Sequence, residues 1–224
     1  MPRNALITDF DGTITLRDFY ELAVAHCLGP DIPDYWSGYA TGAISHFDAI
    51  AGIFSHIRCP ESAVRALVPQ MDADPQLGTA VRQLEAAGWD VIIVSNGSLW
   101  YIEQILAVAG LSHLAVHANP GLFVEGGGLV LERPLDSPFH SPTHGIDKCA
   151  VYREAVARYG RVAFAGNGSP DEAAALLAPP ELRFARGWLA RRLRSRGLPF
   201  RAFERWSEIV PMLCGATPGL SDGV

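Results

Sequence analysis

Several features that would point to common classes of protein are missing from this chain. Its four cysteines lie far apart, at Cys27, Cys59, Cys149 and Cys214, and no pair has the spacing of a zinc site or a CxxC redox motif. No apolar run has membrane-spanning length, and the first residues lack the long apolar segment of a signal peptide. The formal net charge of -6 argues against a general nucleic-acid-binding protein. We therefore expect a cytoplasmic protein that binds neither nucleic acids nor membranes.

Lysine is the scarcest charged residue, because Lys148 is the only lysine among the 18 basic residues. An ammonium group is a compact point charge, whereas the guanidinium group of arginine is a wide planar fork. Position 148 is therefore a candidate for a site that requires an ammonium group. Arginines concentrate between Arg183 and Arg205, and we interpret this cluster as the solvated face of a helix, with anion binding as the alternative.

What the chain does contain is an alternation of apolar runs and helical patterns. Runs at residues 4–8, 90–94, 161–165 and 182–185 have the length of buried strands, and residues 102–109 show apolar side chains at helical spacing. Strands that alternate with helices form right-handed βαβ units and a parallel sheet. We therefore predict an α/β fold with a Rossmann-like, doubly wound parallel sheet. Ligands bind such sheets beyond the carboxyl ends of the strands.

One segment interrupts this alternation. Residues 16–76 contain helical patterns but no clear strand, and a connection of that size must have a structure of its own. We predict a small helical cap domain at residues 16–76, a core domain made of residues 1–15 and 77–216, and a flexible tail at residues 217–224. Apolar residues on both sides of a glycine-rich turn at residues 125–128 also predict a β-hairpin in the second half of the chain.

The first predicted strand runs into the sequence ALITDFDGTIT, in which Asp9 and Asp11 lie two residues apart. Alternate strand positions point to the same side of a sheet, so the repulsion between these two carboxylates requires a cation. A turn cap would need only one carboxylate, so that simpler interpretation is disfavoured. A parallel sheet brings Ser95, Lys148 and Asp171 to the same edge. This set suits phosphoryl transfer, with Mg²⁺ bound by carboxylate and phosphate oxygens.

Four motifs of this sequence, in order, resemble those of the haloacid dehalogenase-like phosphatases: DFDGT, Ser95 after VIIV, Lys148 and GNGSPD. The helical insertion resembles the cap of the branch that contains phosphoserine phosphatase and the methionine-salvage 2-hydroxy-3-keto-5-methylthiopentenyl-1-phosphate phosphatase. The resemblance implies a magnesium-dependent phosphomonoester hydrolase that acts on a small phosphorylated metabolite through an aspartyl-phosphate intermediate. It also allows a homodimer.

The resemblance implies a role for each motif residue. Asp9 would be the nucleophile and a metal ligand, and Asp11 would be the general acid and base and a ligand through its backbone carbonyl. The other implied residues are Ser95, Asn96 and Lys148 for the phosphoryl group, and Asn167 and Asp171 for the metal. In the cap, the residues that we expect to meet the substrate are Asp18, Trp36, Tyr39 and Phe47. For these four residues a helix cap or a place in the core remains the alternative.

The fourth motif departs from the family pattern, which usually begins Gly-Asp, because Asn167 follows Gly166. An amide oxygen can bind Mg²⁺ but brings no negative charge. Two alternatives to a hydrolase therefore stay open. One is a phosphotransferase or phosphomutase with the same nucleophile, and the other is a weakened, regulatory protein that binds a phosphorylated ligand. The same segment predicts the start of a helix with Ser169 as its N-cap and Glu172 closing a capping box.

Overall fold

The computed structural model describes residues 3–29 and 31–215, and the predicted tail at residues 217–224 lies outside them. Its centre is a six-stranded sheet with the order β10-β9-β8-β1-β2-β3, in which all neighbouring strands are parallel. The strands are β1 (Asn4–Thr8), β2 (Trp89–Ser98), β3 (Ala115–Asn119), β8 (Val162–Gly166), β9 (Arg183–Ala185) and β10 (Arg201–Ala202). The prediction of a parallel α/β sheet is confirmed.

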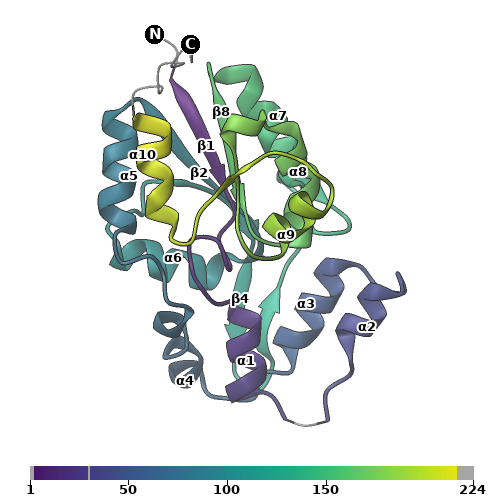
Figure 1. Ribbon diagram of the computed structural model, residues 1–224. Helices are drawn as coiled ribbons and strands as arrows, with labels where there is room; N and C mark the ends of the chain where they lie inside the picture. The colour runs from purple at the N-terminus through teal and green to yellow at the C-terminus, as the bar shows by residue number, and fades with distance from the viewer. Residues whose placement is uncertain (1–2, 30, 216–224) are drawn as a thin grey trace, which may run out of the picture.

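Helices cover both faces of the sheet. Alternate residues of β1 point to opposite faces, and the apolar side chains of both sets are buried. Leu6 lies in one hydrophobic core with α5 (Leu77–Ala86), α6 (Leu99–Val108) and α10 (Ile209–Cys214). Ala5 and Ile7 lie in a second core with α7 (Lys148–Arg158), α8 (Glu172–Leu177) and α9 (Gly187–Ser195). Figure 1 shows α5 and α10 to the left of the sheet and α7, α8 and α9 to the right. The sheet is therefore doubly wound, as predicted.

The segment after β1 folds into helices below the carboxyl ends of the strands (Figure 1). These are α1 (Phe19–Cys27), α2 (Tyr35–Ala40), α3 (His46–Ser55), α4 (Glu61–Arg65) and the 3₁₀-helix η1 (Val68–Met71). Phe19 and Phe54 of this segment share one continuous hydrophobic core with Val91 and Ile93 of β2. Packing between the cap helices and the core domain therefore stabilises both.

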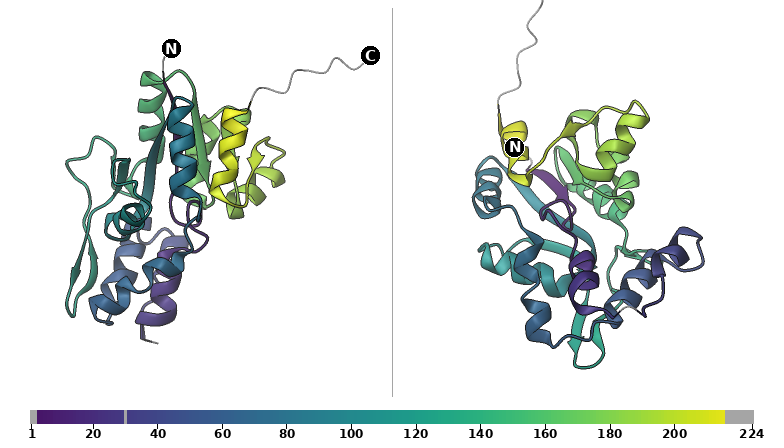
Figure 2. Two further views of the ribbon diagram at one scale, coloured as in Figure 1. Left: turned by 90° about the vertical axis from the view of Figure 1, so that its left-hand side faces the viewer. Right: turned by 60° about the horizontal axis from the view of Figure 1, so that its bottom comes forward.

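The predicted hairpin is present, with antiparallel β4 (Gly121–Val124) and β5 (Gly128–Leu131). Our division by sequence grouped it with the core domain, but it packs against α3 of the cap. Gly128 has a φ of +74°, and a Cβ atom at this position would lie 2.4 Å from the backbone oxygen of Phe54. Only glycine allows this close approach. Figure 2 shows the hairpin extending alongside the cap helices.

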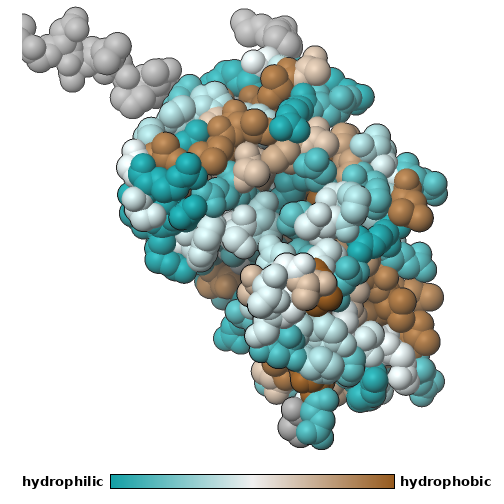
Figure 3. All heavy atoms as spheres, turned by 90° about the vertical axis from the view of Figure 1, so that its right-hand side faces the viewer, coloured by the Kyte–Doolittle hydropathy of each residue, from teal (hydrophilic) through white to brown (hydrophobic). Residues whose placement is uncertain are grey.

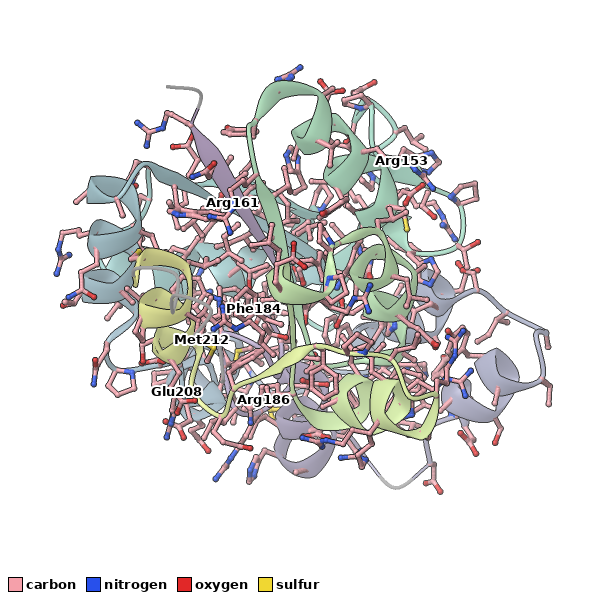
Figure 4. All side chains as sticks on the ribbon, turned by 45° about the horizontal axis from the view of Figure 1, so that its top comes forward. Arg153, Arg161, Phe184, Arg186, Glu208 and Met212 are labelled. Carbon is pink, nitrogen blue, oxygen red and sulfur yellow. The ribbon has the colours of Figure 1, made fainter. Side chains whose placement is uncertain are left out.

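The C-terminal segment packs beside β9 and reaches back to β1. The Arg201 guanidinium lies 5.8 Å from the ring centroid of Phe184 and donates a hydrogen bond to the backbone oxygen of Met212. Phe184 of β9 and Met212 of α10 are labelled in Figure 4. The indole nitrogen of Trp206 donates a hydrogen bond of 2.9 Å to the Thr8 hydroxyl. This buried contact fixes the residue that precedes Asp9, so the end of the chain helps to hold the end of the central strand.

The face of the molecule shown in Figure 3 is mixed in character. On the face that carries α7 to α9 above and α2 and α3 below, hydrophilic residues alternate with small hydrophobic patches (Figure 3). Within residues 3–29 and 31–215, no helix combines the length and the hydropathy needed to span a membrane.

Candidate active site

A cavity of about 340 Å³ lies between the carboxyl ends of the sheet strands and the cap. The core domain supplies its floor and the cap supplies its opposite wall. The lining residues are Asp9, Asp11, Asp18, Tyr20, Trp36, Tyr39, His46, Ile50, Phe54, Ser95, Asn96, Gly97, Tyr101, Lys148, Asn167, Gly168, Ser169, Pro170 and Asp171. Residues of all four sequence motifs are therefore brought together at one place.

Lys148 lies between two carboxylates at the floor of this cavity. Its Nζ atom donates hydrogen bonds of 2.6 Å to Asp9 Oδ1 and 2.6 Å to Asp171 Oδ1. Burial would lower the pKa of Lys148, but the charges of Asp171 and Asp9 outweigh it and raise the pKa. Burial and the charge of Asp171 raise the pKa of Asp9 to about 7, although Lys148 opposes this. The lone lysine is thus a permanently charged bridge between the first and fourth motifs.

Asp11 is held from two sides. The Tyr101 hydroxyl of α6 donates a hydrogen bond of 2.9 Å to Oδ2, and the Ser95 hydroxyl donates one of 3.3 Å to the same oxygen. The backbone N–H of Phe19, in the first cap helix, donates to Oδ1 at 3.2 Å. Burial raises the pKa of Asp11 even though these donors lower it. A raised pKa favours the protonated acid, which is the form that can give a proton to a leaving group.

Asn96, expected to bind the phosphoryl group, uses its side-chain amide elsewhere. The amide nitrogen donates hydrogen bonds to the backbone oxygens of His144 (3.2 Å) and Ile146 (2.9 Å). Asn119 donates to the backbone oxygen of Asn96 at 2.7 Å and also to that of His144 at 3.3 Å. These bonds tie the end of β2 to the segment that leads into α7, where Asp147 is the N-cap and Lys148 is the first residue. Asn96 lines the cavity, but its side chain holds the position of Lys148.

The loop after β8 places Asn167 and Asp171 beside Asp9. The Thr13 hydroxyl lies 2.9 Å from Asp9 Oδ2 and 3.1 Å from Asn167 Oδ1, so these two oxygens are close together. Asp171 Oδ2 accepts hydrogen bonds from the backbone N–H groups of Asn167 (2.9 Å) and Gly168 (2.8 Å). Gly12 makes the approach possible, since a Cβ atom there would lie 2.1 Å from Asn167 Nδ2.

The predicted start of the following helix is wrong in detail. Ser169 is not an N-cap but the first residue of the 3₁₀-helix η2 (Ser169–Asp171), and Gly168 takes the N-cap position. Glu172 closes no capping box and instead forms ion pairs with Arg192 and Arg196 of α9. The buried Asp171 carboxylate instead accepts the hydrogen bonds of the backbone N–H groups in the loop before the helix.

The donor set fits Mg²⁺ in its chemistry. Carboxylate and amide oxygens of Asp9 and Asn167 converge near one hydroxyl, and hard divalent cations prefer such oxygen ligands. Both oxygens of Asp171 already have partners. Within residues 3–29 and 31–215, no three His, Cys, Asp or Glu side chains are grouped as a metal site. The fit therefore relies on few anionic ligands.

The four cap residues that we expected to meet the substrate have different positions in the structure. Asp18, Trp36 and Tyr39 line the cavity, whereas Phe47 does not and instead packs under the Arg133 guanidinium, 4.1 Å from its ring centroid. Asp18 takes the N-cap position of α1 but makes no capping hydrogen bond with its side chain. Burial, followed by the charges of Asp11 and Asp9, raises the pKa of Asp18 to about 8. The helix-cap alternative is thus not realised by the Asp18 carboxyl group.

Several lining or supporting residues were missed by sequence reasoning. Tyr101 fits an ordinary helical pattern, so nothing in its spacing distinguishes it from a core residue. His46 and Asn119 belong to no motif, and only the fold brings them to the site. Thr13 alone had a signal, because it is part of the DFDGT motif.

A family model described as haloacid dehalogenase-like hydrolase matches residues 6–176. The chain therefore belongs to the haloacid dehalogenase-like hydrolases, and it is an enzyme of this family. Among its relatives is 2-hydroxy-3-keto-5-methylthiopentenyl-1-phosphate phosphatase from Brevibacillus brevis, to which it is 24% identical over 215 residues, covering 93% of this chain and 94% of the relative.

Solved structures show the same fold. A HAD family hydrolase from Salmonella enterica serovar Typhi superposes with a TM-score of 0.70 at 15% identity, over 96% of this chain and 72% of that one. Phosphoserine phosphatase from T. onnurineus superposes with a TM-score of 0.63 at 17% identity, over 96% of both chains. At these identities the likeness establishes the architecture, so the substrate has to be inferred from the cavity.

Proposed function

We propose that this protein is a magnesium-dependent phosphomonoester hydrolase that acts on a small organic phosphate through an aspartyl-phosphate intermediate on Asp9. The observation that carries this proposal is the arrangement of Asp9, Lys148 and Asp11 on the floor of one cavity. An anchored carboxylate lies beside a fixed cation, and a second carboxyl group with a raised pKa faces the same space. Membership of the hydrolase family supports the reaction class.

In the first step Asp9 attacks the phosphorus atom, and the bond between phosphorus and the ester oxygen breaks. Asp11 gives its proton to that oxygen, so the product leaves as an alcohol. Lys148 and the Ser95 hydroxyl hold the negative oxygens of the phosphoryl group, where preorganised donors stabilise the charge that develops. Asp11 has its orientation set by Tyr101 and Phe19 before the substrate arrives.

In the second step water attacks the phosphorus atom of the aspartyl phosphate. Asp11, now a carboxylate, takes one proton from that water, and the bond between phosphorus and the Asp9 oxygen breaks. The products are inorganic phosphate and free Asp9, so atoms and charges balance. The cap forms one wall of the cavity and presents Trp36 and Tyr39 to the organic part of the substrate.

Asp9, Asn167 and the backbone carbonyl of Asp11 are the groups that would hold Mg²⁺. Bound there, the ion would neutralise charge on the phosphoryl oxygens. Asp171 positions Lys148, since its two oxygens are occupied by the ammonium group and by backbone N–H groups. Because the protein contributes little negative charge to the ion, substrate phosphate should complete the site. Metal and substrate are then expected to bind with positive coupling.

The proposal is tested by replacing the nucleophile. Asp9→Asn should reduce turnover of p-nitrophenyl phosphate by about 10⁴-fold or more, as removal of a catalytic group that acts within a unit does elsewhere. The fold should be retained, because the change removes one negative charge from a crowded buried site. Asp136→Asn, on an exposed loop outside the cavity, is the matched control.

The intermediate itself provides a second readout. Rapid quenching of the wild-type enzyme followed by peptide mapping should find the phosphoryl group on Asp9, and beryllofluoride should bind there as its mimic. Turnover close to wild type in Asp9→Asn, or a label on another residue, would overturn the mechanism.

A further inference from the structure

Basic side chains are scarce around the cavity. Its lining contains four carboxyl groups, from Asp9, Asp11, Asp18 and Asp171, but Lys148 is the only lysine or arginine among the described residues that line it. The Lys148 ammonium group already contacts two of these carboxylates. In the proposed reaction it is also committed to the phosphoryl group. No cation remains for a second negative group on the substrate.

Apart from Asp18, the cap side of the cavity is lined by aromatic and other uncharged side chains. Tyr20 and Trp36 have ring centroids 5.2 Å apart, Trp36 and Tyr39 6.0 Å apart, and Tyr39 and His46 5.3 Å apart. All three pairs are edge-to-face, with interplanar angles of 69°, 68° and 82°. Each ring thus uses a face or an edge on its neighbour. The rings form a closed apolar surface and not an open cage of faces around a cation.

His46 adds hydrogen-bonding capacity without charge. Burial, together with the charges of His144 and Lys148, lowers the pKa of His46 to about 3, so the imidazole is neutral near pH 7. The ring lines the cavity, and its Nδ1 atom has no hydrogen-bond partner among the described residues. A buried polar atom without a partner is costly. A hydroxyl or carbonyl group beside this neutral ring would fit the wall better than an ion.

We infer that the substrate is a phosphate ester of an uncharged alcohol, with an apolar body and hydroxyl or carbonyl groups, and that the cavity discriminates against esters that carry a carboxylate. A carboxylate in this space would lie near Asp18 and against the aromatic wall without a counter-ion, and burying an unpaired charge is strongly unfavourable. Phosphoserine, which carries a carboxylate and an ammonium group, is therefore expected to be a poor substrate. This inference rests on the proposed phosphatase function and deepens it.

Three two-carbon esters of nearly equal size test the inference directly. They are 2-hydroxyethyl phosphate, 2-phosphoglycolate and 2-aminoethyl phosphate, which end in a hydroxyl, a carboxylate and an ammonium group. We expect kcat/KM for the hydroxyl compound to exceed that for the carboxylate by about tenfold or more, since burying a carboxylate without a counter-ion is strongly unfavourable. We also expect the hydroxyl compound to exceed the ammonium compound. Equal or better use of phosphoglycolate, or a preference for the amine, would overturn the inference.

An engineered cation provides the converse test. Tyr39→Arg places a guanidinium group in the cap wall and should raise kcat/KM for phosphoglycolate relative to 2-hydroxyethyl phosphate. Val108→Arg adds the same charge at an exposed position outside the cavity and should leave that ratio unchanged. If both variants shift the ratio equally, net charge and not the cavity wall sets the preference, and the inference fails. Should Tyr39→Arg not fold, His46→Lys is the second variant.

Failure of the inference can be told apart from failure of the proposed function. Hydrolysis of p-nitrophenyl phosphate that depends on Asp9 tests the function alone. Binding of the three esters is measured by calorimetry with Asp11→Asn and Mg²⁺, which keeps the Asp9 carboxylate and the Asp11 backbone carbonyl for the ion, and it tests the charge rule with little turnover. Tighter binding of the neutral ester supports the rule, and tighter binding of either charged ester or no binding of any ester overturns it.

Discussion

The two sides of the cavity are built in opposite ways. On the core side, each charged group has two or more fixed partners, such as the two carboxylates on Lys148 and the three donors on Asp11. On the cap side, neutral rings pack edge to face and the His46 Nδ1 atom has no partner. Preorganised charge stabilises a transition state, whereas an apolar wall selects by shape and by the cost of desolvating a charge. We therefore expect the core side to govern the rate of the reaction and the cap side to govern substrate selectivity. The following experiments test this division.

After replacement of the nucleophile Asp9, the largest effect is expected on the core side, at Lys148. Lys148→Arg should reduce kcat by about 10²-fold or more, comparable to the loss of one preorganised transition-state donor. The guanidinium fork is too wide for a space in which one nitrogen lies 2.6 Å from each of two carboxylates. Arg158→Lys, the reverse exchange on the exposed end of the same helix, is the control. Nearly full activity of Lys148→Arg would show that the single lysine in the chain is a coincidence.

Tyr101 should come next, with an effect that depends on the leaving group. Tyr101→Phe removes one hydrogen bond to Asp11, worth about 1 kcal/mol, so kcat/KM for an alkyl phosphate should fall roughly fivefold. The loss should be smaller for p-nitrophenyl phosphate, whose leaving group needs little help from an acid. Tyr152→Phe removes a buried hydroxyl that bonds the backbone oxygen of Val162, and it should show no such split. Equal losses on both substrates would mean that Tyr101 only supports the fold.

Changes on the cap side should alter selectivity more than rate. Trp36→Ala or Tyr39→Ala should change the ratio of kcat/KM between metabolite phosphates severalfold, while hydrolysis of a small aryl phosphate changes less. Phe47→Leu is the matched control, because Phe47 lies in the same part of the cap but outside the cavity. If all three variants lose activity equally on every substrate, these aromatic residues serve only packing.

The smallest effect is expected at Asn167. Asn167→Asp adds a carboxylate beside Asp9 and should lower the Mg²⁺ concentration needed for half-maximal activity. Without metal the added negative charge should also lower the melting temperature in EDTA, and Mg²⁺ should restore it. A mutant with the magnesium requirement and the metal-free stability of the parent would show that Asn167 does not contact the ion.

Much of the fold could be predicted because its signals are local. Apolar runs gave the bounds of β1 without error and those of β2, β8 and β9 to within a few residues. The hairpin followed from alternating residues around a glycine-rich turn, but its docking on α3 did not, since the pattern of a hairpin does not say which surface it will cover. Phe47 was placed at the substrate for the same reason. Helical periodicity reveals an apolar face without revealing what that face contacts.

The strand ends, the paired aspartates and the single lysine could be found from the sequence alone, because each depends on residue types at short spacing. What surrounds these residues depends on the tertiary structure. Lys148 bridges Asp9 and Asp171 across 139 and 23 residues of chain, and Tyr101 reaches Asp11 across 90. The tertiary structure also brings four uncharged cap residues to one wall of the cavity: Tyr20, Trp36, Tyr39 and His46. Such contacts depend on how helices pack on a sheet, and burial together with the neighbouring charges then sets the charge of each group.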